Sequence, residues 1–252
     1  MMTMLNDTDL IFPDWPAPAN VKALQTTRAG GESVGPYASL NLGDRVGDNP
    51  LTVAANRQAL NRFASTEPLW LKQVHGVKVV DAATASCLPE ADAAYARAPH
   101  AVCTVMTADC LPVLLCDEAG SVVGAAHAGW RGLLGGVIEA TITAMQAPPD
   151  RLMAWLGPAI GPQAFEVGTE VRDTFVAHDA QAAQAFIAKP NDKWLADIYL
   201  LAKQRLQKMG VNRIYGGDFC TYTDQSRFFS YRRDGVTGRM ASLIWLENQH
   251  QI

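Results

Sequence analysis

The sequence predicts an α+β fold in which mixed β-sheets are packed between outer helices. Short apolar runs typical of strands alternate along the chain with longer segments of helical periodicity. A hairpin signal near the C-terminus indicates antiparallel strands as well, so the sheets are expected to be mixed. The 252 residues suit one large domain or two small ones, and no linker, low-complexity tract or internal repeat divides them.

The first predicted elements are a strand, a long loop and a helix. Val21–Thr27 is expected to be a strand that runs into the glycine loop Arg28–Gly31. Pro36–Asp48 is a polar loop, and its glycines indicate positive φ angles or close backbone approach. A helix is expected next, because Asn49 suits the N-cap position and Pro50 suits the first helical position.

The middle of the chain is predicted to be rich in strands that end at short turns. A strand, a turn at His75–Gly76 and a second strand are expected over Leu69–Val80. Three further strands are predicted at Val102–Met106, Val113–Cys116 and Ser121–Ala126. In Trp130–Met145 apolar residues recur four positions apart, which predicts one helix ended by Pro148-Pro149.

The last third of the chain is predicted to combine strands, helices and a hairpin. Asp234-Gly235 is the hairpin signal, and apolar segments flank it on both sides. The expected elements are strands at Leu152–Leu156 and Val211–Tyr215, helices at Val167–Val176 and Trp194–Met209, and the hairpin strands Phe228–Arg233 and Arg239–Trp245.

The composition excludes several classes of protein. A net charge of -4 argues against a nucleic-acid-binding surface, which needs a basic excess. The N-terminus lacks the pattern of a secretory signal, and no apolar run approaches the roughly 18 residues of a membrane-spanning helix. The five cysteines are irregularly spaced and indicate reduced thiols, so a cytoplasmic location is expected.

His75, Cys110 and His127 are the candidate metal ligands. Each lies beside small or turn-forming residues at the end of a predicted strand, where rigid elements hold side chains in fixed positions. Two imidazoles and one thiolate favour zinc, and copper also suits such a set. Three protein ligands leave a fourth tetrahedral position for water or substrate, so the site is expected to be catalytic, not structural.

Other roles for these three residues are compatible with the sequence. The ligands are far apart in sequence, unlike the short pairs of a zinc finger, so their convergence depends on the fold. His75 could be a turn histidine and Cys110 a small core residue. His127 precedes a strand-to-helix junction, where Arg131 could donate to an oxyanion such as phosphate.

The pattern as a whole resembles the YfiH-type family, whose members are called polyphenol oxidases, laccase-domain proteins or purine nucleoside phosphorylases. The resemblance covers about Val21–Trp245, within a single YfiH-like domain over residues 1–252. The matching segments are Thr26–Gly31, Ser39–Gly43, Gln73–Gly76, Thr107–Pro112, His127–Gly132, Gly157–Pro162 and Phe229–Arg239. The resemblance implies a four-layer α/β/β/α sandwich, related to the deamidase domain of cytotoxic necrotizing factor, and zinc at the three ligands.

The resemblance also implies an activity. The family is associated with phosphorolysis of adenosine, inosine and 5′-methylthioadenosine and with adenosine deamination, so the expected partners are a purine nucleoside and phosphate. We expect Arg28 and Arg131 to contact phosphate. Asn41 and Gln73 could bind sugar or base, or else bond to loop backbone. Asp109 is expected to orient a histidine or to act as a general acid/base.

Three alternatives follow from the same residues. A copper-dependent polyphenol oxidase fits the family's laccase label, although five histidines are too few for a multicopper cluster. A cysteine-type editing hydrolase of peptidoglycan precursors would use Cys110 as nucleophile with His127 or His75 as base. A binding module without turnover is the third alternative. The sequence leaves the oligomeric state open.

Overall fold

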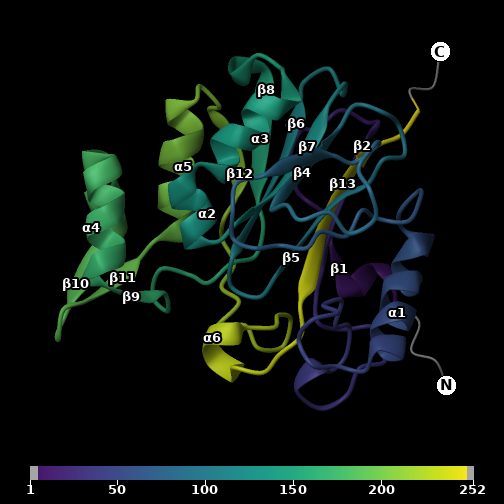
Figure 1. Ribbon diagram of the computed structural model, residues 1–252, viewed down its shortest axis with the longest axis horizontal. Helices are drawn as coiled ribbons and strands as arrows, with labels where there is room; N and C mark the ends of the chain where they lie inside the picture. The colour runs from purple at the N-terminus through teal and green to yellow at the C-terminus, as the bar shows by residue number, and fades with distance from the viewer. Residues whose placement is uncertain (1–4, 249–252) are drawn as a thin grey trace.

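A computed structural model describes residues 5–248, and the ends of the predicted domain, residues 1–4 and 249–252, lie outside the described residues. Two β-sheets lie face to face, with helices on both outer sides (Figure 1). The smaller sheet has the order β1-β2-β13-β5, with β1 (Leu10–Ile11), β2 (Val21–Thr26), β13 (Met240–Leu246) and β5 (Cys103–Thr107). All of its strand pairs are antiparallel.

The larger sheet has the order β12-β8-β6-β7-β4-β3 and mixes parallel with antiparallel pairs. Its strands are β12 (Arg213–Gly216), β8 (Leu152–Leu156), β6 (Leu111–Asp117), β7 (Val123–Ala128), β4 (Ala93–Ala96) and β3 (Val79–Asp81). The α+β class predicted from the sequence is therefore confirmed.

Three apolar clusters separate the layers. In β6, Val113 and Leu115 pack against the helices outside the larger sheet, whereas Leu114 points into the space between the sheets. In β13, Ile244 points into that same inner space and Leu243 packs outward toward the first helix. Successive strand residues point to opposite faces, so each strand contributes to two clusters. The stack has the order helix, sheet, sheet, helix.

The helices cover the outer faces of the two sheets (Figure 1). The helix beside the smaller sheet is α1 (Pro50–Ala59), and those beside the larger sheet are α2 (Trp130–Gly135), α3 (Val137–Met145) and α5 (Ile198–Lys208). Among the described residues, no helix combines the length and the apolar character needed to cross a membrane. The short helix α6 (Tyr231–Asp234) lies near the carboxyl end of β5.

A third, smaller sheet projects from one end of the molecule (Figure 1). Its order is β10-β11-β9, and it carries the helix α4. These elements are β9 (Glu166–Gly168), β10 (Phe186–Lys189), β11 (Lys193–Ala196) and α4 (Thr169–His178). Single-turn or short 3₁₀ helices occur at Asp7–Asp9, Gly35–Tyr37, Leu60–Arg62, Pro149–Arg151 and Ala180–Ala185.

Elements with strong local signals lie where the sequence predicts them. The strand Leu152–Leu156 has the predicted bounds, and β2 ends one residue before the predicted Thr27. Helix α1 begins at Pro50, and the Asn49 side chain accepts the N–H of Leu51 at 2.9 Å. A capping side chain and a proline at the first position fix the start of a helix without help from distant residues.

Three helix predictions are wrong in their extent. The segment Trp130–Met145 is two helices, because Gly136 has a φ of 98° and interrupts the turn between α2 and α3. The helices predicted to begin at Val167 and Trp194 begin later, since both residues lie in the strand pair of β9 and β11. Pairing between distant segments overrides local helical periodicity there.

The predicted hairpin at Asp234-Gly235 is also wrong. Tyr231–Asp234 forms α6, and Gly235 ends it with a φ of 69°. A glycine with positive φ ends helices as readily as it closes hairpins, so the local signal is ambiguous. The strand pair predicted over Leu69–Val80 reduces to isolated bridges and β3, and β7 continues through His127 instead of stopping before it.

Candidate metal centre

The structure brings His75, Cys110 and His127 together. Their ligand atoms all lie within 4.8 Å of one another. The Cys110 Sγ is 3.8 Å from the His75 Nε2, and the two imidazole rings meet edge to face with centroids 4.8 Å apart. His75 is exposed, Cys110 is half-buried and His127 is buried, so the cluster is reached by solvent from the His75 side.

Strand register places two of the three side chains. Strands β6 and β7 are antiparallel, with Leu111 opposite Ala128, so Cys110 lies opposite Gly129. A β-carbon at Gly129 would stand 2.9 Å from the Cys110 Sγ and 3.0 Å from the His75 Cδ2. Only glycine leaves room there for the sulfur and the imidazole, and the backbone of Gly129 therefore forms the floor of the site.

Asp92 positions both histidines. Its Oδ1 lies 2.8 Å from the His127 Nδ1 and accepts the His75 backbone N–H at 2.9 Å. Its Oδ2 accepts the backbone N–H groups of Val74 at 3.1 Å and Gly76 at 2.7 Å. The turn therefore wraps around this buried carboxylate, and His75 adopts a φ of 60° within it.

Asp92 is not among the site residues predicted from the sequence. The available signal was a single carboxylate inside the alanine-rich run Ala91–Ala94, just before a strand. An unpaired carboxylate is costly in such an apolar setting, so it needs a partner from elsewhere in the fold. The antiparallel pairing of β4 with β7 supplies that partner, because it sets Asp92 beside His127.

The thiol and the buried imidazole form a charged pair. Burial opposes ionisation of Cys110, yet the neighbouring His127 and His75 lower the pKa of the Cys110 thiol to about 6. Burial also disfavours the charged form of His127, but Cys110 and Asp92 raise the pKa of His127 to about 9. Cys110 is therefore a thiolate at neutral pH, which is the form that binds metals and attacks electrophiles.

This donor set suits a transition metal. One thiolate and two imidazoles are ligands that zinc and copper both accept. The Nδ1 of His127 donates to the Asp92 carboxylate, which leaves its Nε2 to face the cluster. A carboxylate behind a ligating histidine is the usual arrangement at zinc sites, since it fixes both the ring orientation and the tautomer.

Asp109 is adjacent to Cys110 in sequence but does not orient a histidine. Its Oδ1 accepts the Thr221 hydroxyl at 2.6 Å and its Oδ2 accepts the Arg232 backbone N–H at 2.6 Å. Asp109 has a φ of 91°, so the turn before β6 directs the carboxylate toward α6. The orienting role expected for Asp109 belongs to Asp92, whereas the acid/base role stays a prediction.

Asn41 and Gln73 bond to the backbone. Asn41 is fully buried, and its Oδ1 accepts the N–H groups of Gly43 and Arg239, both at 2.9 Å. The Gln73 amide exchanges two hydrogen bonds with Met106, at 2.7 and 2.8 Å. Of the two roles considered for these amides, bonding to the backbone is the one that the structure contains.

Arg28 and Arg131 lie in different surroundings. The Arg28 guanidinium donates to the carbonyls of Ala38 at 3.0 Å and Gln225 at 3.1 Å, and it lies 4.7 Å from the centroid of the Phe229 ring. Arg131 is exposed and stacks on Trp130 at 4.4 Å, two residues after the glycine that forms the site floor. Phosphate binding by either stays a prediction.

A family model described as "Multi-copper polyphenol oxidoreductase laccase" matches residues 22–247. The Escherichia coli protein "Purine nucleoside phosphorylase YfiH" is 57% identical over 244 residues, which cover 94% of this chain and 98% of the relative. A Pseudomonas aeruginosa protein also named as a purine nucleoside phosphorylase is 55% identical over 239 residues, with the same two coverages.

Solved structures share the fold over nearly the whole chain. A Neisseria meningitidis protein is 54% identical, with a TM-score of 0.94 over 95% of this chain and 100% of its own. YlmD from Geobacillus stearothermophilus is 28% identical, with a TM-score of 0.88 over 98% of this chain and 99% of its own. The two structural relatives differ about twofold in identity and still superpose closely, so the layered architecture tolerates extensive sequence change.

Proposed function

Because the chain belongs to the family of the multi-copper polyphenol oxidoreductase laccase model, and its relatives are named purine nucleoside phosphorylases, we propose that it is a zinc-dependent purine nucleoside phosphorylase. The proposed substrates are adenosine, inosine and 5′-methylthioadenosine, each with inorganic phosphate. His75, Cys110 and His127 would hold the zinc ion. The convergence of these three side chains within 4.8 Å is the observation that carries the proposal.

The reaction joins a phosphate oxygen to the anomeric carbon of the ribose. The bond between that carbon and the purine nitrogen breaks, its electron pair leaves with the purine, and the purine takes up a proton. The products are the free base and ribose 1-phosphate, or 5-methylthioribose 1-phosphate when the substrate is 5′-methylthioadenosine. Bound zinc supplies Lewis-acid stabilisation of an oxygen ligand. Asp109 lies beside Cys110 and is the proposed general acid/base, and Arg28 and Arg131 remain candidates for phosphate contact.

The same centre could support two other reactions. Adenosine deamination would use a nucleophilic water at the purine ring and again needs an acid/base, for which Asp109 is the candidate. Copper binds nitrogen and sulfur donors more tightly than zinc does, so copper loaded into the same three residues would account for weak oxidation of phenols. Both reactions depend on the His75–Cys110–His127 cluster, and the choice between them rests on metal content.

The decisive assay incubates metal-analysed protein with inosine and phosphate and separates the free base from ribose 1-phosphate. We expect turnover to be lost on exhaustive chelation and restored by zinc. Cys110→Ser should abolish both zinc binding and turnover, whereas Cys87→Ser serves as the control because that thiol is exposed elsewhere. Absence of ribose 1-phosphate with every purine nucleoside tested would remove the proposal.

A second candidate is a metal-free cysteine hydrolase acting on a cell-wall precursor. One observation favours it: thiolate, imidazole and carboxylate follow one another in Cys110, His127 and Asp92, the order found in cysteine nucleophile triads. This hydrolase would keep its activity after chelation and lose it on thiol alkylation. Rescue by zinc after chelation separates the two functions.

A further inference from the structure

Arg239 lies beside the turn that carries Asp109 and Cys110. It immediately precedes β13, where Met240 pairs with Thr107, the last residue of β5. Contacts through helix α6 also link Arg239 to this turn. The carboxylate of Asp109 accepts the N–H of Arg232 in α6, and the ring of Tyr231, the first residue of that helix, lies 5.9 Å from the Arg239 guanidinium carbon.

The Arg239 side chain is held in one position. Its backbone N–H is bound by the buried Asn41 amide at 2.9 Å, and its Nη1 donates to the carbonyls of Thr237 and Gly238, both at 3.0 Å. Its aliphatic part lies against Gly43, where a β-carbon would stand 2.8 Å from the Arg239 Cγ. Ordering of a flexible side chain costs binding free energy, and here that cost is met by the fold.

The guanidinium has no carboxylate partner among residues 5–248. Arg57, Arg205 and Arg233 each have one within 4.0 Å, but Arg239 does not. Within the same range its Nε and Nη2 make no hydrogen bond, since only Nη1 is engaged. Burial lowers the pKa of Arg239, and the negative groups that oppose this are Cys110 and Asp109. A partly buried cation with no carboxylate within ion-pair distance favours an anionic ligand.

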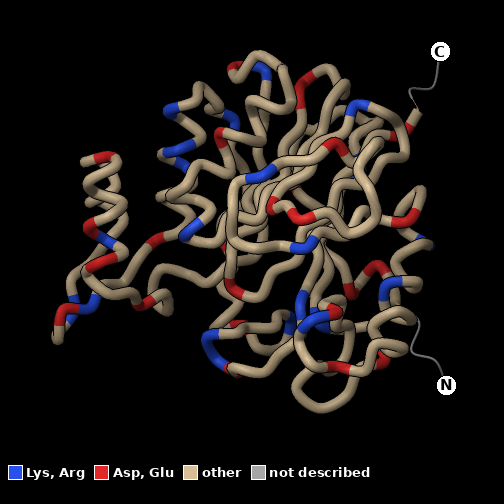
Figure 2. The backbone as a smooth tube through the Cα atoms, viewed as in Figure 1, with Lys and Arg blue, Asp and Glu red and all other residues tan. Residues whose placement is uncertain are grey.

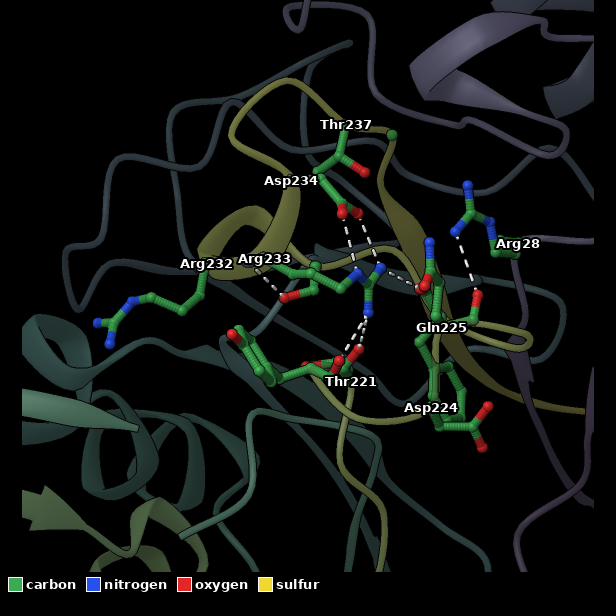
Figure 3. Close-up of polar contacts among 12 residues, drawn as sticks. Arg28, Thr221, Asp224, Gln225, Arg232, Arg233, Asp234 and Thr237 are labelled. Carbon is green, nitrogen blue, oxygen red and sulfur yellow. Dashed lines mark hydrogen bonds and ion pairs between the residues drawn. The ribbon is translucent and has the colours of Figure 1, made fainter. Parts of the chain in front are cut away.

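Neighbouring arginines are less suited to binding an anion. Lys and Arg gather on and beside α6 in Figure 2. Figure 3 shows the Arg233 guanidinium bonded to Asp234 and to carbonyls of the Thr221 loop, while the Arg232 side chain points away. Arg28 donates to the Gln225 carbonyl in the same view, and burial together with the nearby positive charge of Arg233 lowers the pKa of Arg28.

We propose that Arg239 binds a phosphate oxyanion beside the His75–Cys110–His127 cluster through its Nε and Nη2. That edge of a guanidinium presents two parallel N–H groups, which match two oxygens of a phosphate. This inference rests on the proposed function insofar as the anion is the attacking phosphate. We favour Arg239 over Arg28 and Arg131 as the main phosphate contact, because it is held in place, has no carboxylate partner among the described residues and lies near the turn that carries Cys110.

The test uses zinc-loaded full-length protein and two substitutions, Arg239→Gln and Arg239→Lys. The control is Arg172→Gln, an arginine that also stacks on an aromatic ring but lies on α4. Calorimetric titration with inorganic phosphate and with inosine 5′-monophosphate measures binding without turnover. Kinetics then give the KM for phosphate and the KM for inosine, and melting temperature and zinc content confirm that each variant is folded.

We expect Arg239→Gln to weaken phosphate binding and to raise the KM for phosphate by about 10- to 100-fold, the effect of losing a bidentate charge-assisted pair. The KM for inosine should change less than about twofold, since uniform loss of structure would move both values. Arg239→Lys should retain part of the phosphate affinity, because it keeps the charge and loses the paired geometry.

The outcomes separate this inference from the proposed function. Unchanged phosphate affinity in both variants overturns the assignment of Arg239, even if the wild-type protein phosphorolyses inosine. Phosphate binding that depends on Arg239 without any turnover supports the assignment and refutes phosphorolysis. Binding of inosine 5′-monophosphate alone, again dependent on Arg239, supports the oxyanion site and identifies a phosphate ester as its ligand.

Discussion

Replacing Asp92 with asparagine should disturb the positions of His75 and His127, because both bond to this carboxylate. The carboxylate accepts four hydrogen bonds, two at each oxygen. Asparagine has nearly the same shape but turns one oxygen into a donor. If the amide nitrogen faces Val74 and Gly76, two backbone N–H groups lose their acceptor. If it faces His127, the His75 N–H loses its acceptor, the imidazole must accept at Nδ1, and its proton moves to the Nε2 that faces the cluster.

Either orientation of the asparagine amide has a measurable cost. A hydrogen bond to a charged group contributes roughly 1.5–3 kcal/mol, so losing those from Val74 and Gly76 lowers the free energy of unfolding by about 3–6 kcal/mol, and losing that from His75 alone lowers it by about half as much. Loss of the carboxylate behind a ligating histidine typically lowers metal affinity by about 10- to 100-fold. We therefore expect weaker zinc binding by Asp92→Asn in competition with a chromophoric chelator, and a lower urea midpoint.

Asp117→Asn is the matched control for this experiment. Asp117 is also buried and accepts two backbone N–H groups, from Ser121 and Val122, together with the Ser121 hydroxyl. It lies at the other end of β6 from Cys110, so its loss should destabilise the fold while zinc affinity stays unchanged. Zinc affinity in Asp92→Asn equal to that of Asp117→Asn would refute the positioning role of Asp92.

Three further predictions concern the same site. Gly129→Ala should lower zinc affinity by about tenfold or more because its β-carbon would press on the Cys110 sulfur, whereas Gly135→Ala in α2 should not; equal affinities measured by chelator competition would contradict this. In metal-stripped protein, alkylation of Cys110 followed by peptide mass spectrometry should be half-maximal near pH 6, while buried Cys103, whose pKa is raised, stays unmodified; a midpoint near pH 9 would argue against the thiolate. Burial opposes ionisation of Asp92, but hydrogen bonds from His127 and from backbone N–H groups outweigh it and lower the pKa of Asp92. The stabilisation of the fold by this carboxylate is therefore present above about pH 4 and is lost as the pH falls through the lowered pKa. Urea midpoints from pH 7 to 3 should fall more steeply in wild type than in Asp92→Asn, and parallel curves would contradict this.

Local signals predicted much of the fold. Asn49 and Pro50 identify a helix start because the cap and the fixed proline φ act within a few residues. Leu152–Leu156 is a buried strand recognisable from its apolar run alone. The errors at Val167 and Trp194 have a common cause, since each pairs with the other across β9 and β11 and no local pattern reports a distant partner.

The three candidate metal ligands could be predicted from the sequence, whereas the residues around them could not. His75, Cys110 and His127 are identified by side-chain chemistry, because imidazole and thiolate are the strongest zinc donors. Asp92 and Arg239 look ordinary in sequence, one within an alanine run and one among several arginines. Their places depend on the register of β4 with β7, which sets Asp92 beside His127, and of β13 with β5, which sets Arg239 near the turn that carries Cys110.

Strand β13 lies between β2 and β5, although it is the last of the described strands in the sequence. Until Met240–Leu246 has been synthesised, β2 and β5 therefore each have an edge without a pairing partner. Arg239 arrives together with this strand. Chains truncated before β13 would keep His75, Cys110 and His127 but lack Arg239, and they would expose the unpaired edges of β2 and β5, which favour aggregation.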